Sequence, residues 1–186
     1  MSKQLQAMLE HNRHFVETKA YEPYLTSKLP NKKAVILTCM DARLIELLPK
    51  ALGLQNGDAK VVKNAGAVVT SLEDSIVRSI LVALYELEAE EVYVIGHHGC
   101  GMIGMEGSNI VEKAKSRSST AAQIADTFES EAQAGAWLNG FTTVEENVSD
   151  SVQLLRTHPL LPDDTAVHGL VIHPETGAVD VVTEET

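Results

Sequence analysis

Two motifs that together contain both cysteines of the chain each follow a short apolar run. The runs, residues 34–37 and 92–95, are rich in β-branched side chains and have the length of buried strands. Thr-Cys-Met-Asp-Ala-Arg follows the first run at 38–43, and Gly-His-His-Gly-Cys-Gly follows the second at 96–101. Because ligands bind at the carboxyl edge of parallel α/β sheets, we expect the two motifs to meet there in a binding site.

The residue types in these motifs predict a zinc site with the ligands Cys39, His97 and Cys100. Thiolates bind zinc at about 2.3 Å and imidazoles at about 2.0–2.1 Å, in a tetrahedron. Three protein ligands leave a fourth position, which water occupies in catalytic sites and a protein group occupies in structural ones. Asp41 is the candidate for controlling that position. Paired with Arg43 it would orient a zinc-bound water, and released from Arg43 it would bind zinc as a fourth ligand.

The rest of the pattern predicts an α/β fold in which a mostly parallel central sheet is flanked by helices. Strands and helices alternate along residues 34–95, which is typical of parallel strands joined by right-handed crossovers. The predicted strands are 34–38, 59–63 and 92–95, followed by a C-terminal hairpin of 167–173 and 178–182. The predicted helices are 3–18, 44–52, 71–88 with Ser71 as N-cap, 121–128, 132–138 and 143–156. We expect residues 101–120 to be mobile apart from a short helix at 109–115.

The length and the net charge of the chain limit the class of protein. A chain of 186 residues has the size of one domain, so we treat 1–186 as a single zinc-binding α/β domain. Its 26 acidic residues against 15 lysines and arginines give a formal net charge of −11. Such a surface repels phosphate backbones and anionic lipids, and we expect neither a nucleic-acid nor a membrane partner. Without a signal-peptide core, we expect a cytoplasmic protein whose cysteines are thiols or metal ligands.

The two motifs also resemble the signature of the β-class carbonic anhydrases, Cys-x-Asp-x-Arg followed by Gly-His-x-x-Cys-Gly. The block Asn64-Ala65-Gly66 is similar to a third signature of that family. The resemblance implies a lyase that hydrates carbon dioxide reversibly to bicarbonate and a proton, using a zinc-bound hydroxide oriented by Asp41. It also implies a homodimer or larger homo-oligomer. The amphipathic helix and proline-containing arm of residues 1–30 are suited to packing on a partner subunit.

A substrate pocket is expected beside the metal, formed by Asn64, Gly66, Ala67 and Gly101. The small side chains are compatible with a tight apolar cavity, and backbone amides near Gly66 and Gly101 could hold an oxyanion. Two thiolates donate more negative charge to zinc than histidines do. We therefore expect the bound water to be acidified less and the activity to favour alkaline pH.

Two positions depart from the family pattern. His98-Gly99 stands where Thr-Asp is common, which removes an acid near the metal and makes His98 a possible proton shuttle. Lys63 stands where arginine is usual, so a bidentate contact would be lost there. Neither departure changes a predicted zinc ligand.

Other interpretations stay open on the sequence alone. A related zinc hydrolase could act on carbonyl sulfide or carbon disulfide. A non-catalytic, zinc-stabilised binding protein would keep its site closed by Asp41. A redox protein pairing Cys39 with Cys100 is disfavoured, because the two cysteines do not form Cys-x-x-Cys. Buried cysteines and an Asp41–Arg43 salt bridge could also be purely structural.

Overall fold

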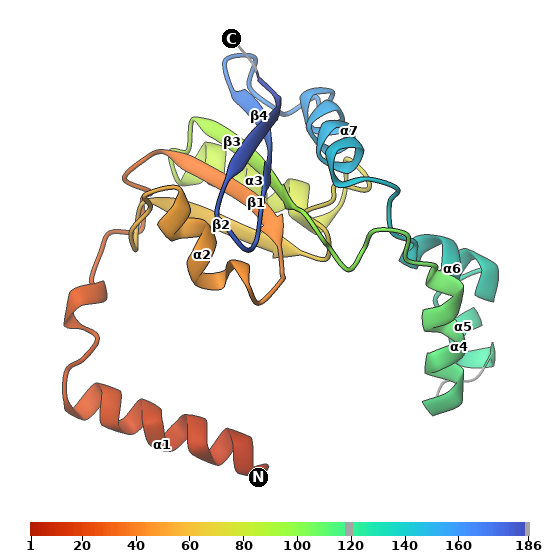
Figure 1. The fold of residues 1–186 in the computed structure, drawn as a ribbon, viewed down its shortest axis with the longest axis horizontal. Helices are drawn as coiled ribbons and strands as arrows, with labels where there is room; N and C mark the ends of the chain where they lie inside the picture. Colours follow the sequence, from red (N-terminus) through yellow and green to blue (C-terminus); the bar gives the residue numbers. More distant parts are fainter. Residues whose placement is uncertain (118–120, 185–186) are drawn as a thin grey trace.

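The computed structural model describes residues 1–117 and 121–184. At its centre lies a five-stranded sheet with the strand order β2-β1-β3-β4-β5 (Figure 1). The strands are β1 (Ala34–Cys39), β2 (Ala59–Asn64), β3 (Glu91–His97), β4 (Ala166–Ile172) and β5 (Val179–Thr183). The first four run parallel, and β5 pairs antiparallel with β4 at one edge. The predicted parallel sheet and its C-terminal hairpin are confirmed.

The helices agree with the predicted order, with differences at their ends. They are α1 (Lys3–Glu17), α2 (Leu44–Ala51), α3 (Ser75–Glu86), α4 (Gly107–Arg117), α5 (Ala121–Ala125), α6 (Glu131–Leu138) and α7 (Val144–Arg156), with a short 3-10 helix at Glu22–Tyr24. Helix α4 is longer than the predicted 109–115, and residues 118–120 of the segment predicted to be mobile lie outside the described residues.

Helix α3 starts four residues later than predicted, because Asp74 and not Ser71 caps it. The Asp74 carboxylate accepts hydrogen bonds from the amides of Ile76 and Val77, at 2.9 and 2.8 Å. These are two of the four amides that the first turn of a helix leaves without a partner. The carboxylate of Asp74 accepts hydrogen bonds from both amides at once, so the helix is capped at Asp74.

The central strands are buried on both faces, as expected for a parallel sheet covered by helices. Val35 and Leu37 of β1 pack into the core formed with α3 and α7. Ile36, pointing the other way, packs with Leu44 and Leu48 of α2. All six residues of β1 are buried, which explains why this strand appears in the sequence as a continuous apolar run. Cys39, the last residue of β1, is therefore held in place by the packing of the strand.

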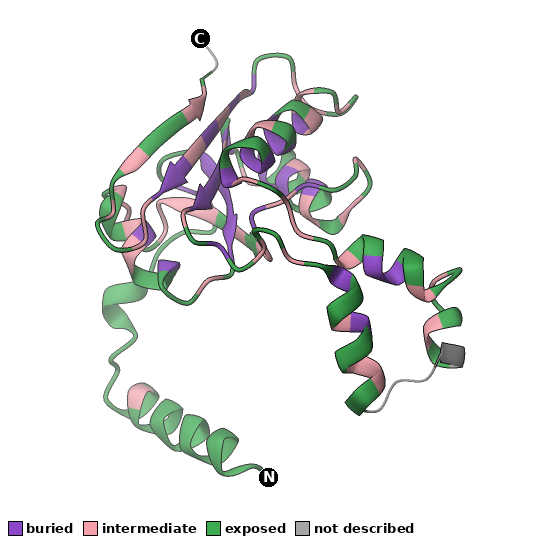
Figure 2. Ribbon diagram, turned by 45° about the vertical axis from the view of Figure 1, so that its right-hand side comes forward, coloured by how far each residue is buried: buried purple, intermediate pink, exposed green. Residues whose placement is uncertain are grey.

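Two helical extensions project from the sheet and its covering helices (Figures 1 and 2). Helix α1 buries none of its residues, and its apolar side chains Leu5, Met8, Leu9 and Val16 are exposed. Helices α4 and α6 pack against each other in a second extension, which leaves the sheet after β3 and returns to α7. The segment that contains Cys100 therefore connects the sheet with the second extension.

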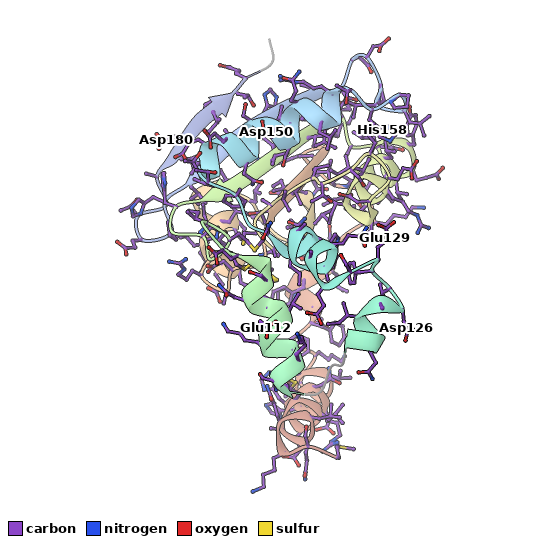
Figure 3. The ribbon with its side chains drawn as sticks, turned by 90° about the vertical axis from the view of Figure 1, so that its right-hand side faces the viewer. Glu112, Asp126, Glu129, Asp150, His158 and Asp180 are labelled. Carbon is purple, nitrogen blue, oxygen red and sulfur yellow. The ribbon has the colours of Figure 1, made fainter. Side chains whose placement is uncertain are left out.

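Acidic side chains lie on the outer surface of the sheet with its covering helices and on that of the second extension. Figure 3 shows Glu112 on α4, Asp126 after α5, Asp150 on α7 and Asp180 on β5, and all four residues are exposed. Within residues 1–117 and 121–184, no helix combines the length and apolar character needed to cross a membrane.

Candidate metal centre

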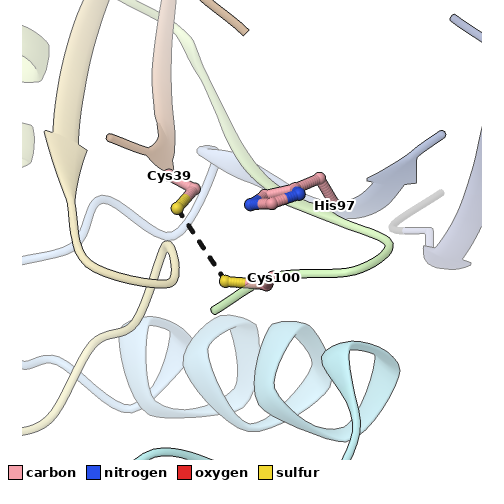
Figure 4. Close-up of side chains that lie close together, drawn as sticks. All are labelled: Cys39, His97 and Cys100. Atoms are coloured by element: carbon pink, nitrogen blue, oxygen red, sulfur yellow. Dashed lines mark hydrogen bonds between the residues drawn. The ribbon is translucent and has the colours of Figure 1, made fainter. Parts of the chain in front are cut away.

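The two cysteine-containing motifs meet at the carboxyl edge of the sheet, as predicted. Cys39 is the last residue of β1 and His97 is the last residue of β3, the strand beside it. Cys100 follows three residues later in the loop that leaves β3, and its side chain returns toward Cys39 (Figure 4). All three residues are buried, with exposed fractions of 5% for Cys39, 0% for His97 and 6% for Cys100.

The three side chains form a compact cluster that can hold a metal ion. Their potential ligand atoms all lie within 4.8 Å of one another, and the two sulfurs are 3.9 Å apart (Figure 4). Both cysteines are free, so the cluster is not a disulfide. Two sulfurs and one imidazole nitrogen form a ligand set typical of zinc sites.

The orientation of His97 supports a metal at this place. Its Nδ1 donates a hydrogen bond to the backbone oxygen of His98 at 3.0 Å, which makes Nε2 the nitrogen with a free lone pair. Nε2 is buried and has no hydrogen-bond partner in the described part of the chain. Burying such an atom without a partner is costly, and coordination would satisfy it. No residue pattern marks this backbone acceptor, because a carbonyl oxygen is present at every residue.

The environment makes the two thiols unequal. Burial raises the pKa of Cys39, but the neighbouring His97 ring and the backbone amides of Gly66 and Asp41 outweigh it and lower this pKa to about 7. Burial raises the pKa of Cys100, and the negative charge of Cys39 raises it further. Cys39 is therefore the thiol that ionises more readily, and a bound dication would favour the thiolate form of both.

Asp41 lies beside the cluster and is bound by Arg43. The guanidinium donates from Nε to Oδ1 at 3.0 Å and from Nη2 to Oδ2 at 2.8 Å, and the Arg43 backbone amide donates to Oδ1 at 2.8 Å. These contacts hold the pKa of Asp41 well below its usual range. Oδ2 also lies 3.7 Å from Nε2 of His97, which is too far for a hydrogen bond. The carboxylate thus faces the cluster while remaining paired.

The loop after β2 forms another wall of the centre. The Asn64 side chain closes this loop by donating to the Val68 oxygen at 2.6 Å and accepting from the Val68 amide at 3.1 Å. The Gly66 amide donates to the sulfur of Cys39 at 3.4 Å. This amide is therefore engaged with a candidate ligand and is not free for the oxyanion contact expected from the sequence.

An apolar pocket of about 560 Å³ opens next to this loop. Asn64 lines it, together with Met40, Met102, Trp137 and Phe141. Gly66, Ala67 and Gly101, the other residues expected in the pocket, do not line it. The first two are buried inside the loop, whereas Gly101 is exposed. The methionine and aromatic walls come from three separate segments, and no local pattern in the sequence links them.

The two positions that depart from the family pattern lie at the margin of the centre. Nδ1 of His98 is 3.8 Å from Oε1 of Glu145, and its ring is 5.7 Å from the ring of His173. Lys63 is exposed near the end of β2. Neither side chain belongs to the metal-binding cluster.

A mostly parallel sheet with a Cys-His-Cys cluster that could hold a metal ion at its carboxyl edge can be compared with known proteins. The profile of the carbonic anhydrase family matches residues 34–179. The provisionally named carbonic anhydrase YvdA of Bacillus subtilis (strain 168) is 57% identical over 178 residues, which cover 96% of this chain and 90% of YvdA. A carbon disulfide hydrolase of Acidithiobacillus thiooxidans is 30% identical over 155 residues, covering 79% of this chain and 75% of the hydrolase.

The three-dimensional comparison agrees with the sequence. The crystal structure of β-carbonic anhydrase isoform I from Trichomonas vaginalis matches with a TM-score of 0.87 and 31% identity, and each chain is covered over 100% of its length. The chain therefore belongs to the β-class carbonic anhydrase family.

Proposed function

We propose that this protein hydrates carbon dioxide reversibly to bicarbonate and a proton, with zinc held by Cys39, His97 and Cys100. The observation that carries the proposal is the buried Nε2 of His97, which lacks a hydrogen-bond partner within the described residues and lies beside two free thiols. Imidazole and thiolate together favour zinc over the hard cations magnesium and calcium. When bound, zinc supplies a Lewis acid that lowers the pKa of water and makes hydroxide available as the nucleophile.

Asp41 orients the attacking oxygen in this proposal. Its carboxylate is ionised at neutral pH, and Arg43 lowers its pKa further below the usual range, so the carboxylate can only accept hydrogen bonds. Accepting one from the reacting water would turn a lone pair of that water toward the substrate. Arg43 also donates to the Gly99 oxygen at 3.2 Å, which ties the pair to the loop that contains Cys100. Asp41 released from Arg43 could instead bind the metal and close the site.

The pocket beside the centre supports an uncharged, apolar substrate. Its walls are mainly methionine, aromatic and aliphatic side chains, with asparagines at a few positions. Carbon dioxide carries no charge and needs no ion-pairing group to enter. The second candidate substrate is carbon disulfide or carbonyl sulfide. It is favoured by the apolar volume of the pocket and by the similarity to a carbon disulfide hydrolase.

We also propose that the protein is a homodimer or larger homo-oligomer in which residues 1–30 of one subunit pack on another. Helix α1 has 15 residues and buries none of them. Isolated helices of this length are only marginally stable in water, and most helices gain their stability by burying an apolar face. The exposed side chains of Leu5, Met8 and Leu9 provide such a face.

Stopped-flow measurement of carbon dioxide hydration on protein of known zinc content tests the proposal, with Cys39→Ser as the control. We expect zinc-dependent turnover that increases toward alkaline pH and is lost in the Cys39 variant. A protein with one zinc per chain and no hydration activity would overturn it. Turnover of carbonyl sulfide or carbon disulfide would then support the second candidate, and inactivity toward all three would indicate a structural metal.

A further inference from the structure

Asn147 is a buried amide on the apolar face of α7. The helix faces the sheet with Val144, Val148, Val152 and Leu155, and Asn147 is only 5% exposed among them. Burying an amide costs free energy unless its polar atoms find hydrogen-bond partners. The hydrogen bonds that the Asn147 side chain makes therefore indicate its role in the structure.

Two consecutive hydrogen bonds connect Asn147 with the candidate metal ligand Cys39. Nδ2 of Asn147 donates to the backbone oxygen of Gly66 at 3.0 Å. The amide of Gly66 in turn donates to the sulfur of Cys39 at 3.4 Å. Both polar backbone groups of Gly66 are thereby fixed, one by α7 and the other on the sulfur.

The backbone between these contacts adopts a conformation that must be held by its surroundings. Gly66 has a φ of 89°, and a Cβ at this position would lie 2.7 Å from a ring carbon of Phe141. The next residue, Ala67, has a φ of 57°, which is unfavourable for a residue with a side chain, and it is fully buried. Such conformations persist only where neighbouring contacts determine them, and they cluster at functional sites.

We propose that Asn147 is a positioning residue for the metal centre, which holds the Gly66 carbonyl so that the Gly66 amide points at the sulfur of Cys39. A hydrogen bond to a coordinating sulfur withdraws electron density from it, so Asn147 tunes the charge that Cys39 donates to the metal. This inference rests on the proposed metal site, and it assigns to α7 a role that reaches the metal through the backbone of the loop.

Ser151 provides a matched control one helical turn further along α7. It is also buried, and its Oγ accepts a hydrogen bond from the amide of Val69 at 3.0 Å. Ser151 and Asn147 therefore each tie the same loop to the same helix. Only the Asn147 contact is made to Gly66, the residue that bonds to the Cys39 sulfur. Removing either contact loosens the loop, whereas removing the contact of Asn147 also changes the environment of the sulfur.

The test uses the full chain with Co²⁺ in place of zinc and compares Asn147→Leu, Asn147→Ala and Ser151→Ala. The thiolate-to-cobalt absorption band reports the electron density on sulfur, and competition with a chelator reports metal affinity. We expect both Asn147 variants to move the band to longer wavelength, because the sulfur becomes richer in electrons. We also expect metal binding to weaken by about 10-fold to 100-fold, because the loop no longer holds Cys39 in its position. Ser151→Ala should leave the band in place. If Asn147→Leu does not fold, Asn147→Ala provides the test, because alanine adds no bulk to the core.

The outcomes separate this inference from the proposed function. A band that stays in place in the Asn147 variants, or that moves equally in Ser151→Ala, overturns the positioning role. A wild-type protein without a thiolate-to-cobalt band overturns it as well, together with the metal site. A wild-type protein that shows the band and the expected variant shifts, but hydrates no carbon dioxide, supports the positioning role and overturns only the proposed activity.

Discussion

Arg43 donates three hydrogen bonds to the carboxylate of Asp41, and the same carboxylate faces the ring of His97. Because Asp41 is acceptor-only in this state, it can direct a proton of the attacking water and cannot supply one. Asp41→Asn keeps the size of the side chain but replaces one acceptor with a donor. We expect carbon dioxide hydration to fall by about 10²-fold or more, with zinc content unchanged. Stopped-flow rates and metal analysis on the same preparation check this, and an undiminished rate would contradict the role of Asp41.

We expect Arg43 to affect the reaction through its contacts with Asp41. Arg43→Ala removes the guanidinium that holds the carboxylate, so Asp41 becomes free to bind the metal and activity should fall while zinc stays bound. In the Asp41→Asn background the same change should cost little more, because residues that act as a unit are not additive. Rates of the two single variants and the double variant measure this coupling. Independent, multiplying losses would show that Arg43 acts by another route.

Metal removal should destabilise the protein. A bound metal would be the common partner of the buried Nε2 of His97 and the two thiols, and its removal would leave them without it. A ligand that binds only the folded state stabilises that state by about 2.7 kcal/mol when its free concentration is 100 times its dissociation constant. We expect a chelator to lower the melting temperature and added zinc to restore it. His97→Ala should show no response to zinc. A wild-type melting temperature that is insensitive to both treatments would argue against a metal at this cluster.

The sequence allowed the meeting of Cys39, His97 and Cys100 to be predicted because its signals are local. Cys39 and His97 end apolar strand-forming runs, and parallel strands bring their carboxyl ends to one edge. The cap of α3 was misplaced because Ser71 and Asp74 are both good capping residues, and only the structure shows which one meets the amides of Ile76 and Val77.

The contacts around the cluster were less predictable for a physical reason. The acceptor for His97 is a backbone oxygen, which has no sequence signature. The pocket joins Met40, Met102, Trp137 and Phe141 from distant segments, and only the packing of the second extension brings them together. Asn147 and Gly66 are 81 positions apart, so their contact also depends on the tertiary fold.

The loop after β2 should not tolerate a side chain at Gly66. Gly66→Ala would place a methyl group 2.7 Å from Phe141 and force alanine into a left-handed conformation, which alone costs about 1–2 kcal/mol. Gly53→Ala is the control, because Gly53 has a φ of 64° but no atom within 4 Å of the added carbon. Urea unfolding should show a larger loss for Gly66→Ala than for Gly53→Ala, and the metal affinity should fall only in the former. Equal losses would mean that the contact with Phe141 relaxes freely.

The exposed apolar face of α1 should be required for assembly. Leu5 and Leu9 lie on one side of this helix at a spacing of four residues, and 45% and 41% of their surfaces are exposed. Placing a charge there by Leu5→Glu and Leu9→Glu would oppose burial against a partner subunit. We expect the double variant to be monomeric by light scattering, whereas Ala7→Glu, on the opposite side of the same exposed helix, should keep the wild-type mass. An assembled double variant, or a monomeric wild-type protein, would show that α1 does not join subunits. If the double variant is monomeric as expected, its carbon dioxide hydration activity will show whether each candidate metal centre functions within one chain.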